Sequence, residues 1–151
     1  QLCRLAALKW GCGAENVING IPRTVGDEKN CWMAPMSKSP VLSLKWEEEI
    51  RPAQVRILLD SNLSREITPS INRGVLARQA KGTPPELILY FRLIFCKKGE
   101  VKKELLCDGK GQRLQVIDIE KEISADEIRI LPLGTYGSEN AAVFEVRVYG
   151  R

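Results

Sequence analysis

The sequence predicts an all-β protein, either a sandwich or a barrel, and three observations support this fold class. After Val41, apolar residues recur at every second position in several short segments, which is the spacing of half-buried strands. Glycine, proline, asparagine and aspartate separate these segments, as they do at turns. No strong amphipathic helical pattern lies between them, so seven or eight short strands must cover one another.

The first two predicted strands are VLSLKWE (41–47) and AQVRILLD (53–60), and Pro52 marks the connection between them. In both strands apolar residues alternate with polar or charged ones, so one face of each is expected to turn toward the core. The residues expected on that face are Leu42, Leu44, Trp46, Val55, Ile57 and Leu59.

The longest apolar run is ELILYFRLIFC (86–96), which is rich in β-branched and aromatic residues. It is predicted to be a strand covered on both faces. KKGE then turns the chain into VKKELLC (101–107), and the two strands form a hairpin. Cys96 and Cys107 are not equidistant from this turn, so the two thiols should not face each other.

Three further strands complete the prediction. QRLQVIDIE (112–120) carries apolar residues on both faces, so the face that turns inward is left open. DEIRILPL (126–133) turns Ile128 and Ile130 inward. AVFEVRVYG (142–150) alternates most regularly of all. It is expected to place on one side Phe144, Val146 and Val148, and on the other Glu145, Arg147 and Tyr149.

Histidine is absent from the chain. This excludes serine–histidine–aspartate and cysteine–histidine nucleophile systems, histidine acid–base catalysis, and histidine-ligated zinc, iron or copper. Carboxylates such as Asp60, Glu66 and Asp108 remain, but the sequence shows no pair of nucleophile and base. We therefore expect that this chain alone is not an enzyme.

The cysteine spacing and the charge distribution disfavour several kinds of ligand and partner. The five cysteines include no C-x-x-C spacing, so neither a zinc cluster nor a thioredoxin-like motif is predicted, and buried, unpaired thiols are the simplest interpretation. The formal net charge is +4, but basic residues are interleaved with acidic ones and no basic block exceeds two residues. This distribution does not favour nucleic acid as a partner.

The chain of 151 residues has the length of one domain. Its start, QLCRLAALKW (1–10), is the only segment with helical spacing, and it is too short to be stable alone. Residues 1–13 are therefore predicted to be a linker or the tail of a preceding segment, and 14–151 the β-sandwich domain. No apolar run approaches the ~18 residues of a membrane-spanning helix, so no membrane partner is expected, and the compartment is left open.

Several segments, taken in order, resemble a known family. AENVINGIPR…NCW, PVLSLKWEEEIRPAQVRILLD and IRILPLGTYGSENAAVFEVRVYGR resemble the galactose-binding-domain-like modules of discoidin (F5/8 type C) type, over about 14–151. More narrowly, ENVINGIPR, DSNLSRE, TPPELILYFRLIF and GQRLQV together are similar to the C-terminal module of some bacterial FAD-dependent oxidoreductases. No G-x-G-x-x-G motif opens a helix, so the flavin domain itself is not in this sequence.

The resemblance implies a jelly-roll β-sandwich of two antiparallel sheets that is usually non-catalytic and binds glycans through loops at one end. The loops that would carry such a site are 20–32, 61–85 and 133–142. The function expected from it is that of a carbohydrate-binding accessory module. The alternative is a structural or protein-docking C-terminal module of a larger enzyme, whose partner is the upstream domain and which binds no sugar of its own.

A glycan site would combine an aromatic platform with polar groups that bind the sugar hydroxyls. Tyr136, in the loop LGTYGSEN, is the expected platform, whereas Trp32 is expected to be a structural plug in the core. The candidate polar partners on the loops are Arg23, Asn62, Arg65, Arg73 and Asn140.

The resemblance also implies one structural calcium ion. Its ligands would be the Asn16 carbonyl, Asn19, Ile21, Thr24, the Phe144 carbonyl and Glu145. In this chain Asn19 offers a neutral amide, Ile21 offers no side-chain oxygen, and Glu145 is the only anion of the set. Calcium prefers six to eight oxygens with charge-balancing carboxylates, so we expect this site to be weak or empty, with Arg23 pairing with Glu145 in place of the ion. No other cofactor is expected.

Overall fold

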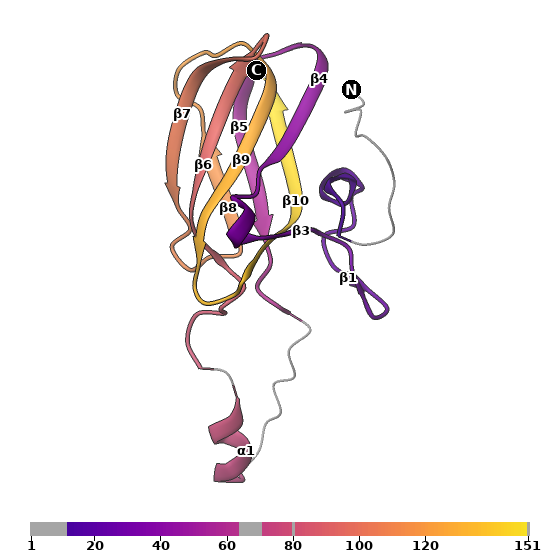
Figure 1. Ribbon diagram of the computed structural model, residues 1–151, viewed down its shortest axis with the longest axis vertical. Coiled ribbons are helices and arrows are strands. Elements are labelled where there is room, and N and C mark those ends of the chain that lie inside the picture. The colour runs from indigo at the N-terminus through magenta and orange to yellow at the C-terminus, as the bar shows by residue number, and fades with distance from the viewer. Residues whose placement is uncertain (1–11, 64–70, 80, 151) are drawn as a thin grey trace.

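The computed structural model describes residues 12–63, 71–79 and 81–150, with only the backbone of Arg78 in helix α1. The helical segment predicted at 1–10 lies outside these ranges. The described residues form two four-stranded antiparallel sheets that pack face to face, as Figure 1 shows. The predicted all-β sandwich of two antiparallel sheets is confirmed.

One sheet consists, in spatial order, of β3 (Trp32–Pro35), β10 (Asn140–Gly150), β5 (Pro52–Leu59) and β8 (Leu114–Asp118). The other consists of β4 (Leu42–Ile50), β9 (Ala125–Thr135), β6 (Ile88–Lys97) and β7 (Glu100–Asp108). A small hairpin of β1 (Thr24–Val25) and β2 (Glu28–Lys29), two 3-10 turns (Ala14–Ile18 and Met36–Lys38) and one short helix, α1 (Arg73–Arg78), complete the described elements.

The core between the sheets contains the residues that the alternation predicts. At most 2% of the surface of each is exposed for Leu42, Leu44, Val55, Ile57, Leu59, Ile128 and Ile130. Trp32 is also buried in this core, as expected for a structural plug, while Trp46 is only half-buried at its edge. The strands therefore form where apolar side chains alternate, because each sheet must cover one face with the other sheet.

The two cysteines of the β6–β7 hairpin do not face each other, as predicted, although a bulge after Phe95 shifts the register by one residue. Cys96 pairs with Val101 across the turn, and Cys107 pairs with Phe91. Phe91, Leu93 and Phe95 of β6 enter the core, and Ile94 and Cys96 on the opposite face are buried as well. The prediction that this strand is covered on both faces is therefore correct only in part, because Tyr90 and Arg92 on the outer face are exposed.

The facing of β8, which the sequence leaves open, is set by Ile117, which packs against the main core, whereas Leu114 and Val116 are each about half exposed. Gln115 is on the same side as Ile117 and is buried too. Its side-chain amide donates hydrogen bonds to the carbonyls of Gly109 (2.8 Å) and Gln112 (2.7 Å). Because these bonds satisfy the amide, a polar residue is tolerated at this inward position.

A β-bulge in β10 changes the facing of Phe144. Val143 pairs with Leu59 and Glu145 with Leu58, so the register shifts by one residue between them. Val143 and Val146 both enter the main core, while Phe144 packs in a separate cluster with Cys31 and Ala142. The prediction that Phe144 shares a face with Val146 and Val148 is therefore wrong, because a bulge inserts one residue and re-aims the side chain beside it.

The long connection between β5 and β6 leaves the sandwich and carries α1, which lies beyond the strand ends in Figure 1. The Asn72 side chain caps this helix by accepting a hydrogen bond from the Gly74 N–H (2.8 Å). The sequence predicts only a loop here. With six residues, α1 is too short to show a clear helical period. Within the described ranges, no helix has the length and apolar character needed to cross a membrane.

The β4-β9-β6-β7 sheet carries a buried ion pair on its outer side. Arg129 binds Glu127 through two hydrogen bonds of 2.8 and 2.9 Å, and the Ser43 hydroxyl donates a third to the same carboxylate. The hydrogen bonds from Arg129 outweigh the opposing effect of burial and hold the pKa of Glu127 below its usual 4.5.

We expect Glu127→Gln to lower the free energy of unfolding at pH 7 by about 1–2 kcal/mol, because it removes a charge-assisted bidentate pair. The pKa of Glu127 is lower in the folded than in the unfolded state, so its contribution is full above pH 4.5 and disappears as the pH falls through the folded-state pKa. Urea unfolding of both proteins at several pH values measures this. Glu100→Gln, on an exposed ion pair with Lys102, is the control and should lower the free energy of unfolding, at any of these pH values, by much less than Glu127→Gln does at pH 7, because solvent screens that pair.

Candidate functional site

A pocket of about 140 Å³ lies where β5 ends and β8 begins, at the end of the sandwich that also carries the long connection to β6. β10, β5 and β8 are neighbours in one sheet, so Phe144, residues 60–63 and Arg113 meet there although they are distant in sequence. The segment of β1 and β2 closes the pocket with three further residues, Arg23, Thr24 and Lys29.

A buried carboxylate forms one wall of the pocket. Asp60 is 1% exposed, and its Oδ2 accepts a hydrogen bond from the Lys29 ammonium at 2.8 Å. Its Oδ1 accepts a second one from the Asn62 N–H at 2.6 Å, which bends the chain at the end of β5. Burial lowers the pKa of Lys29, but the hydrogen bond and the charge of Asp60 outweigh it, so that this pKa lies above 10.5 and the amine is charged.

The opposite wall consists of a guanidinium lying over an aromatic ring. The Arg113 guanidinium carbon is 5.7 Å from the centroid of the Phe144 ring, a cation–π distance. Its Nη2 donates a hydrogen bond to the Pro22 carbonyl at 2.9 Å. The Arg113 backbone is fixed too, because its carbonyl accepts a hydrogen bond from the Leu59 N–H at 2.8 Å. The bulge in β10 is what turns Phe144 toward this guanidinium.

Two polar atoms of the pocket residues lack a partner. Among the described residues, the buried side-chain nitrogens and oxygens without a hydrogen bond are Ser61 Oγ and Arg113 Nε. Both residues line this pocket. Buried polar groups in folded proteins are nearly always satisfied by protein, water or a ligand, so the coincidence of two orphaned groups at one pocket marks a place where a bound molecule or an ordered water supplies the missing partners.

The structure brings some of the predicted binding residues together and separates others. Arg23 and Asn62 line the pocket, and the Asn62 side chain also donates a hydrogen bond to Glu86 at 3.0 Å. Tyr136 lies on the turn between β9 and β10, Asn140 is the first residue of β10, and neither lines the pocket. Arg73 is the first residue of α1 and does not line the pocket either. Arg65 lies outside the described residues.

The residues proposed for calcium do not form a suitable donor set. The Asn19 Oδ1 accepts hydrogen bonds from the Ile21 N–H (2.9 Å) and from Asn30 Nδ2 (3.0 Å), and Asn19 Nδ2 donates to Asn30 Oδ1 (2.7 Å). Asn30 Nδ2 also donates to the Ile21 carbonyl. This reciprocal amide pair uses the oxygens that a cation would need and places N–H donors among them. Within the described part of the chain, no three His, Cys, Asp or Glu side chains gather as a metal site.

The other members of that set have separate roles. The Asn16 side chain donates a hydrogen bond to the Cys31 carbonyl at 3.0 Å, and Thr24 lines the pocket beside Phe144. Glu145 accepts a hydrogen bond from Arg147 at 2.8 Å, whereas Arg23 lines the pocket. The predicted pairing of Arg23 with Glu145 is wrong. Arg147, two positions later on the same face of β10, binds the Glu145 carboxylate instead.

Sequence reasoning misses five residues of this pocket: Lys29, Asp60, Ser61, Leu63 and Arg113. The position of Asp60 gives an indication, since a carboxylate directly after the apolar run of β5 is expected to lie close to the core. The sequence alone, however, identifies it only as a carboxylate without a partner. Nothing in the sequence indicates that Lys29 and Arg113 belong to the pocket, because their positions near Asp60 depend on which strands are neighbours in the sheet.

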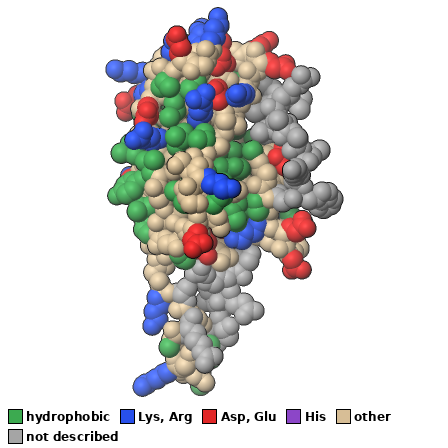
Figure 2. All heavy atoms as spheres, viewed as in Figure 1, with side chains coloured by type: hydrophobic (Ala, Val, Ile, Leu, Met, Phe, Trp, Pro, Cys, Tyr) green, Lys and Arg blue, Asp and Glu red, His purple; other side chains and the backbone are tan. Residues whose placement is uncertain are grey.

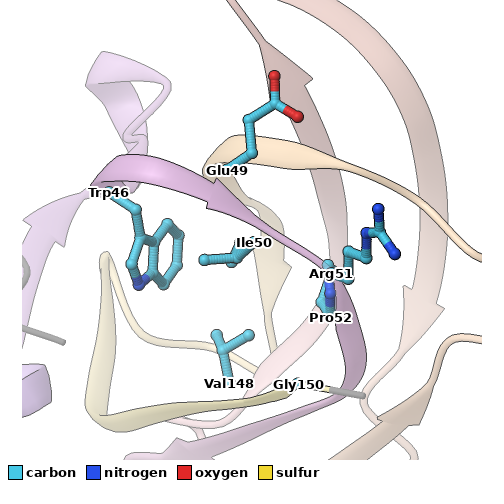
Figure 3. A pocket seen from close by; sticks show the side chains of 7 residues that line it. All are labelled: Trp46, Glu49, Ile50, Arg51, Pro52, Val148 and Gly150. Atoms are coloured by element: carbon cyan, nitrogen blue, oxygen red, sulfur yellow. The ribbon is translucent and has the colours of Figure 1, made fainter.

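A larger hollow, of about 480 Å³, lies at the opposite end of the sandwich. Figure 3 shows Trp46, Ile50 and Val148 converging on it, while the charged ends of Glu49 and Arg51 point away. Glu49 binds Lys97 and Ser124, and Arg51 binds Glu122. With its charged groups already paired, and with no unpartnered buried polar atom of the described residues in its lining, this hollow is a weaker candidate than the pocket at Asp60.

Comparison with solved structures supports the observed fold. No family model matches the chain, and no curated protein sequence matches it either. Several solved structures, however, match the chain in fold. The family 32 carbohydrate-binding module from Streptococcus pneumoniae EndoD matches with a TM-score of 0.66 at 14% identity, over 97% of this chain and 91% of that one.

Two further structures match similarly. The family 32 module from C. perfringens NanJ, in complex with galactose, has a TM-score of 0.59 at 15% identity, over 93% of this chain and 86% of that one. The lectin domain of lectinolysin, complexed with Lewis B antigen, has a TM-score of 0.66 at 9% identity, over 94% and 86%. At such identities the likeness shows a shared fold, and it confirms the galactose-binding-domain-like jelly roll.

Proposed function

We propose that this protein is a non-catalytic carbohydrate-binding module and that it binds its glycan in the pocket between Arg23, Asn62 and Arg113. The observation that carries the proposal is the pair of orphaned buried groups, Ser61 Oγ and Arg113 Nε, at this one pocket. A sugar hydroxyl both donates and accepts hydrogen bonds, so one sugar ring supplies partners for both.

The size and chemistry of the pocket suit the end of a glycan. At about 140 Å³ it is smaller than the ~300–1,000 Å³ of sites that enclose a drug-sized ligand, so a terminal sugar residue fits better than an oligosaccharide. Asn62 and Thr24 add amide and hydroxyl groups at its wall. The neighbours that carry galactose or Lewis B antigen on this fold support a glycan ligand over the docking alternative.

Binding without catalysis also agrees with the carboxylates of the described residues. Asp60 is paired with Lys29, and Asp108 accepts a hydrogen bond from the Lys110 N–H at 2.9 Å in a turn. Glu66 lies outside the described residues. We therefore propose that the chain holds a glycan for an activity located elsewhere.

A glycan array probed with the wild type and two variants tests this proposal. Arg113→Gln should lose at least about tenfold in binding to every glycan that the wild type binds, because it removes an orphaned donor from the pocket. Tyr136→Ala, on the neighbouring turn, is the matched control and should bind normally. Circular dichroism verifies that both variants fold. Binding that depends on Tyr136 but not on Arg113 would place the site on the turn, and a folded wild type without glycan hits would overturn the proposal.

One observation favours the docking alternative as a second candidate. On the outer face of the β4-β9-β6-β7 sheet, Tyr90 (43% exposed), Leu106 (70%) and Leu133 (47%) expose apolar surface on adjacent strands. Figure 2 shows hydrophobic side chains gathered over this face, with charged groups of both signs around them. Such a patch is typical of a contact with another domain, and glycan binding at the strand ends leaves it free.

A further inference from the structure

We infer that the ligand of the pocket is an acidic sugar, whose carboxylate or sulfate group binds between Arg23 and Arg113. This inference rests on the proposed function and names the class of glycan. The observation behind it is the charge of the lining, which contains three cations and one anion: Arg23, Lys29, Arg113 and Asp60.

Lys29 and Asp60 neutralise each other across 2.8 Å, so the two guanidinium groups determine the net charge of the wall. Arg23 makes no hydrogen bond or ion pair with another described side chain and is exposed. Arg113 bonds only a neutral carbonyl and stacks on Phe144. Glu86 accepts a hydrogen bond from the Asn62 side chain and is not part of the lining. Among the residues that the structure describes, Asp60 is the one anion of the lining, so two positive charges of this lining have no counter-charge within it.

The orphaned Nε of Arg113 points to the same chemistry. A guanidinium presents its N–H groups as a planar fork that matches the two oxygens of a carboxylate or sulfate, and such charge-assisted hydrogen bonds are about twice as strong as neutral ones. The Nη2 of this fork already binds the Pro22 carbonyl, while the Nε–H has no acceptor. An anionic oxygen at this position satisfies the donor and neutralises its charge in one contact.

The pocket also lacks what a neutral sugar needs most. Neutral sugars gain affinity by placing their apolar face on an exposed aromatic ring. Phe144 is only 5% exposed and is covered by the Arg113 guanidinium, and the apolar residue left at the rim is Leu63, which is 71% exposed. Charge and hydrogen bonds must therefore supply the affinity that stacking does not.

Paired titrations test the class of ligand. Galacturonic, glucuronic and N-acetylneuraminic acids are each titrated by calorimetry beside their methyl esters, which keep the ring and lose the charge. We expect at least one acid to bind about tenfold or more tighter than its ester, and we expect this ratio to fall at 0.5 M salt. Arg23→Gln should reduce the ratio, whereas Arg73→Gln on α1, which removes the same charge outside the pocket lining, should not.

The outcomes separate the two proposals. If each methyl ester binds as tightly as its acid, or if galactose binds as tightly as the sugar acids, the acidic-sugar inference is overturned and the proposed function stands. If inorganic sulfate binds as tightly as every sugar acid, the pocket is a simple anion site, and the sugar inference is again overturned. If the folded protein binds none of these probes and no glycan on the array, both the inference and the proposed function are overturned.

A second, independent observation concerns two cysteines. The Cys12 and Cys31 sulfur atoms lie 3.7 Å apart although the residues are 19 positions apart in sequence. Cys31 is fully buried at the start of β3, and the Cys12 carbonyl accepts a hydrogen bond from the Met33 N–H at 3.1 Å, so both backbones are held in place. Cys96 and Cys107 are paired with other residues in the β6–β7 hairpin, and Cys3 lies outside the described residues.

From this geometry we infer that Cys12 and Cys31 form a disulfide when the protein meets a small disulfide oxidant such as oxidised glutathione. The Cys12 thiolate attacks the oxidant and displaces one glutathione thiolate, and Cys31 then displaces the second. Two protein thiols become one disulfide, and their two protons end on the two glutathione thiols that are released. Burial, together with the neighbouring Cys12, raises the pKa of the Cys31 thiol to about 12, which makes the more accessible Cys12 the first to react.

Peptide mapping and thermal unfolding test the disulfide. After treatment with oxidised glutathione, the tryptic peptides 10–23 and 30–38 should appear as one linked species. The melting temperature should rise by about 6–12 °C, as expected for closing a loop of this length in a chain of this size. Cys31→Ser should abolish both effects, while a Cys96→Ser and Cys107→Ser double variant should keep them. A link to Cys3, or stable mixed disulfides with glutathione, would overturn this inference.

Discussion

Replacing Phe95 by alanine should lower the free energy of unfolding by about 4 kcal/mol, within the ~3–5 kcal/mol usual for a fully buried phenylalanine. Phe95 lies in the second half of β6, with Lys103 of β7 and Ile128 of β9 as its cross-strand neighbours, and none of its surface is exposed. β6 is paired on both sides at this position, so the sheet has little freedom to collapse into the cavity. Urea unfolding followed by tryptophan fluorescence measures the loss.

The matched control lies on the adjacent strand. Leu106→Ala also shortens a large apolar side chain in this sheet, but Leu106 is 70% exposed and should change the free energy of unfolding by less than about 0.5 kcal/mol. The urea dependence of both variants should equal that of the wild type, because neither changes the surface exposed on unfolding appreciably. Equal losses for the two variants would contradict the placement of the core between the sheets.

The sequence predicts the core because its signal is local. Alternation every second residue states which side chains of one strand share a face, and a sandwich has one interior for them to share. Leu42, Ile57 and Ile130 come from different strands, yet each is buried as its own segment predicts. The order of the quoted segments along the chain then identifies the jelly roll, although no family model matches.

The errors arise where the local period is interrupted. The bulge between Val143 and Glu145 adds one residue to β10 and sends Phe144 to the opposite face. The sequence AVFEVRVYG gives no indication of this bulge, since its apolar and polar residues alternate without a break. The inward position of Gln115 is likewise tolerated because two carbonyls of the preceding turn satisfy its amide, and only the folded chain brings them within reach.

The pocket could be predicted only in part, because it is assembled by strand order. Arg23 and Asn62 were identified as polar residues on loops of the correct end. Arg113 and Lys29 are charged residues without any distinguishing neighbours in the sequence, and they meet Asp60 because β8 pairs with β5 and because the β1–β2 segment folds beside β10. Long-range pairing of this kind leaves no period in the sequence.

Asp60→Ala is expected to lower the free energy of unfolding by about 2–3 kcal/mol. The substitution leaves Lys29 with a charge but no partner and frees the Asn62 N–H, two losses that together typically cost about 3–5 kcal/mol when both groups are fully buried. Lys29 is about one-third exposed and can turn toward water, which reduces the loss. Asp60→Asn keeps an oxygen for the Asn62 N–H and should cost less.

A double-mutant cycle isolates the pair. Lys29→Ala leaves a 1% exposed carboxylate without its cation, so this single change should also destabilise the protein. The double variant should lose less than the sum of the two singles, with a coupling of at least about 1 kcal/mol, because neither remaining group is left unpaired. Strictly additive losses would contradict a direct pair between Lys29 and Asp60.

A substitution of Asp60 should change protein stability and ligand binding in opposite directions. Asp60→Asn removes the only anion of the pocket lining and leaves the three cations in place, so its effect on binding should have the opposite sign to its effect on stability. The acidic sugar that the wild type prefers should bind more tightly relative to its methyl ester, while the melting temperature falls. A structural defect that merely loosened the pocket would weaken the acid and the ester together. A higher ratio of acid to ester binding in a less stable protein is therefore specific to a pocket whose affinity comes from charge.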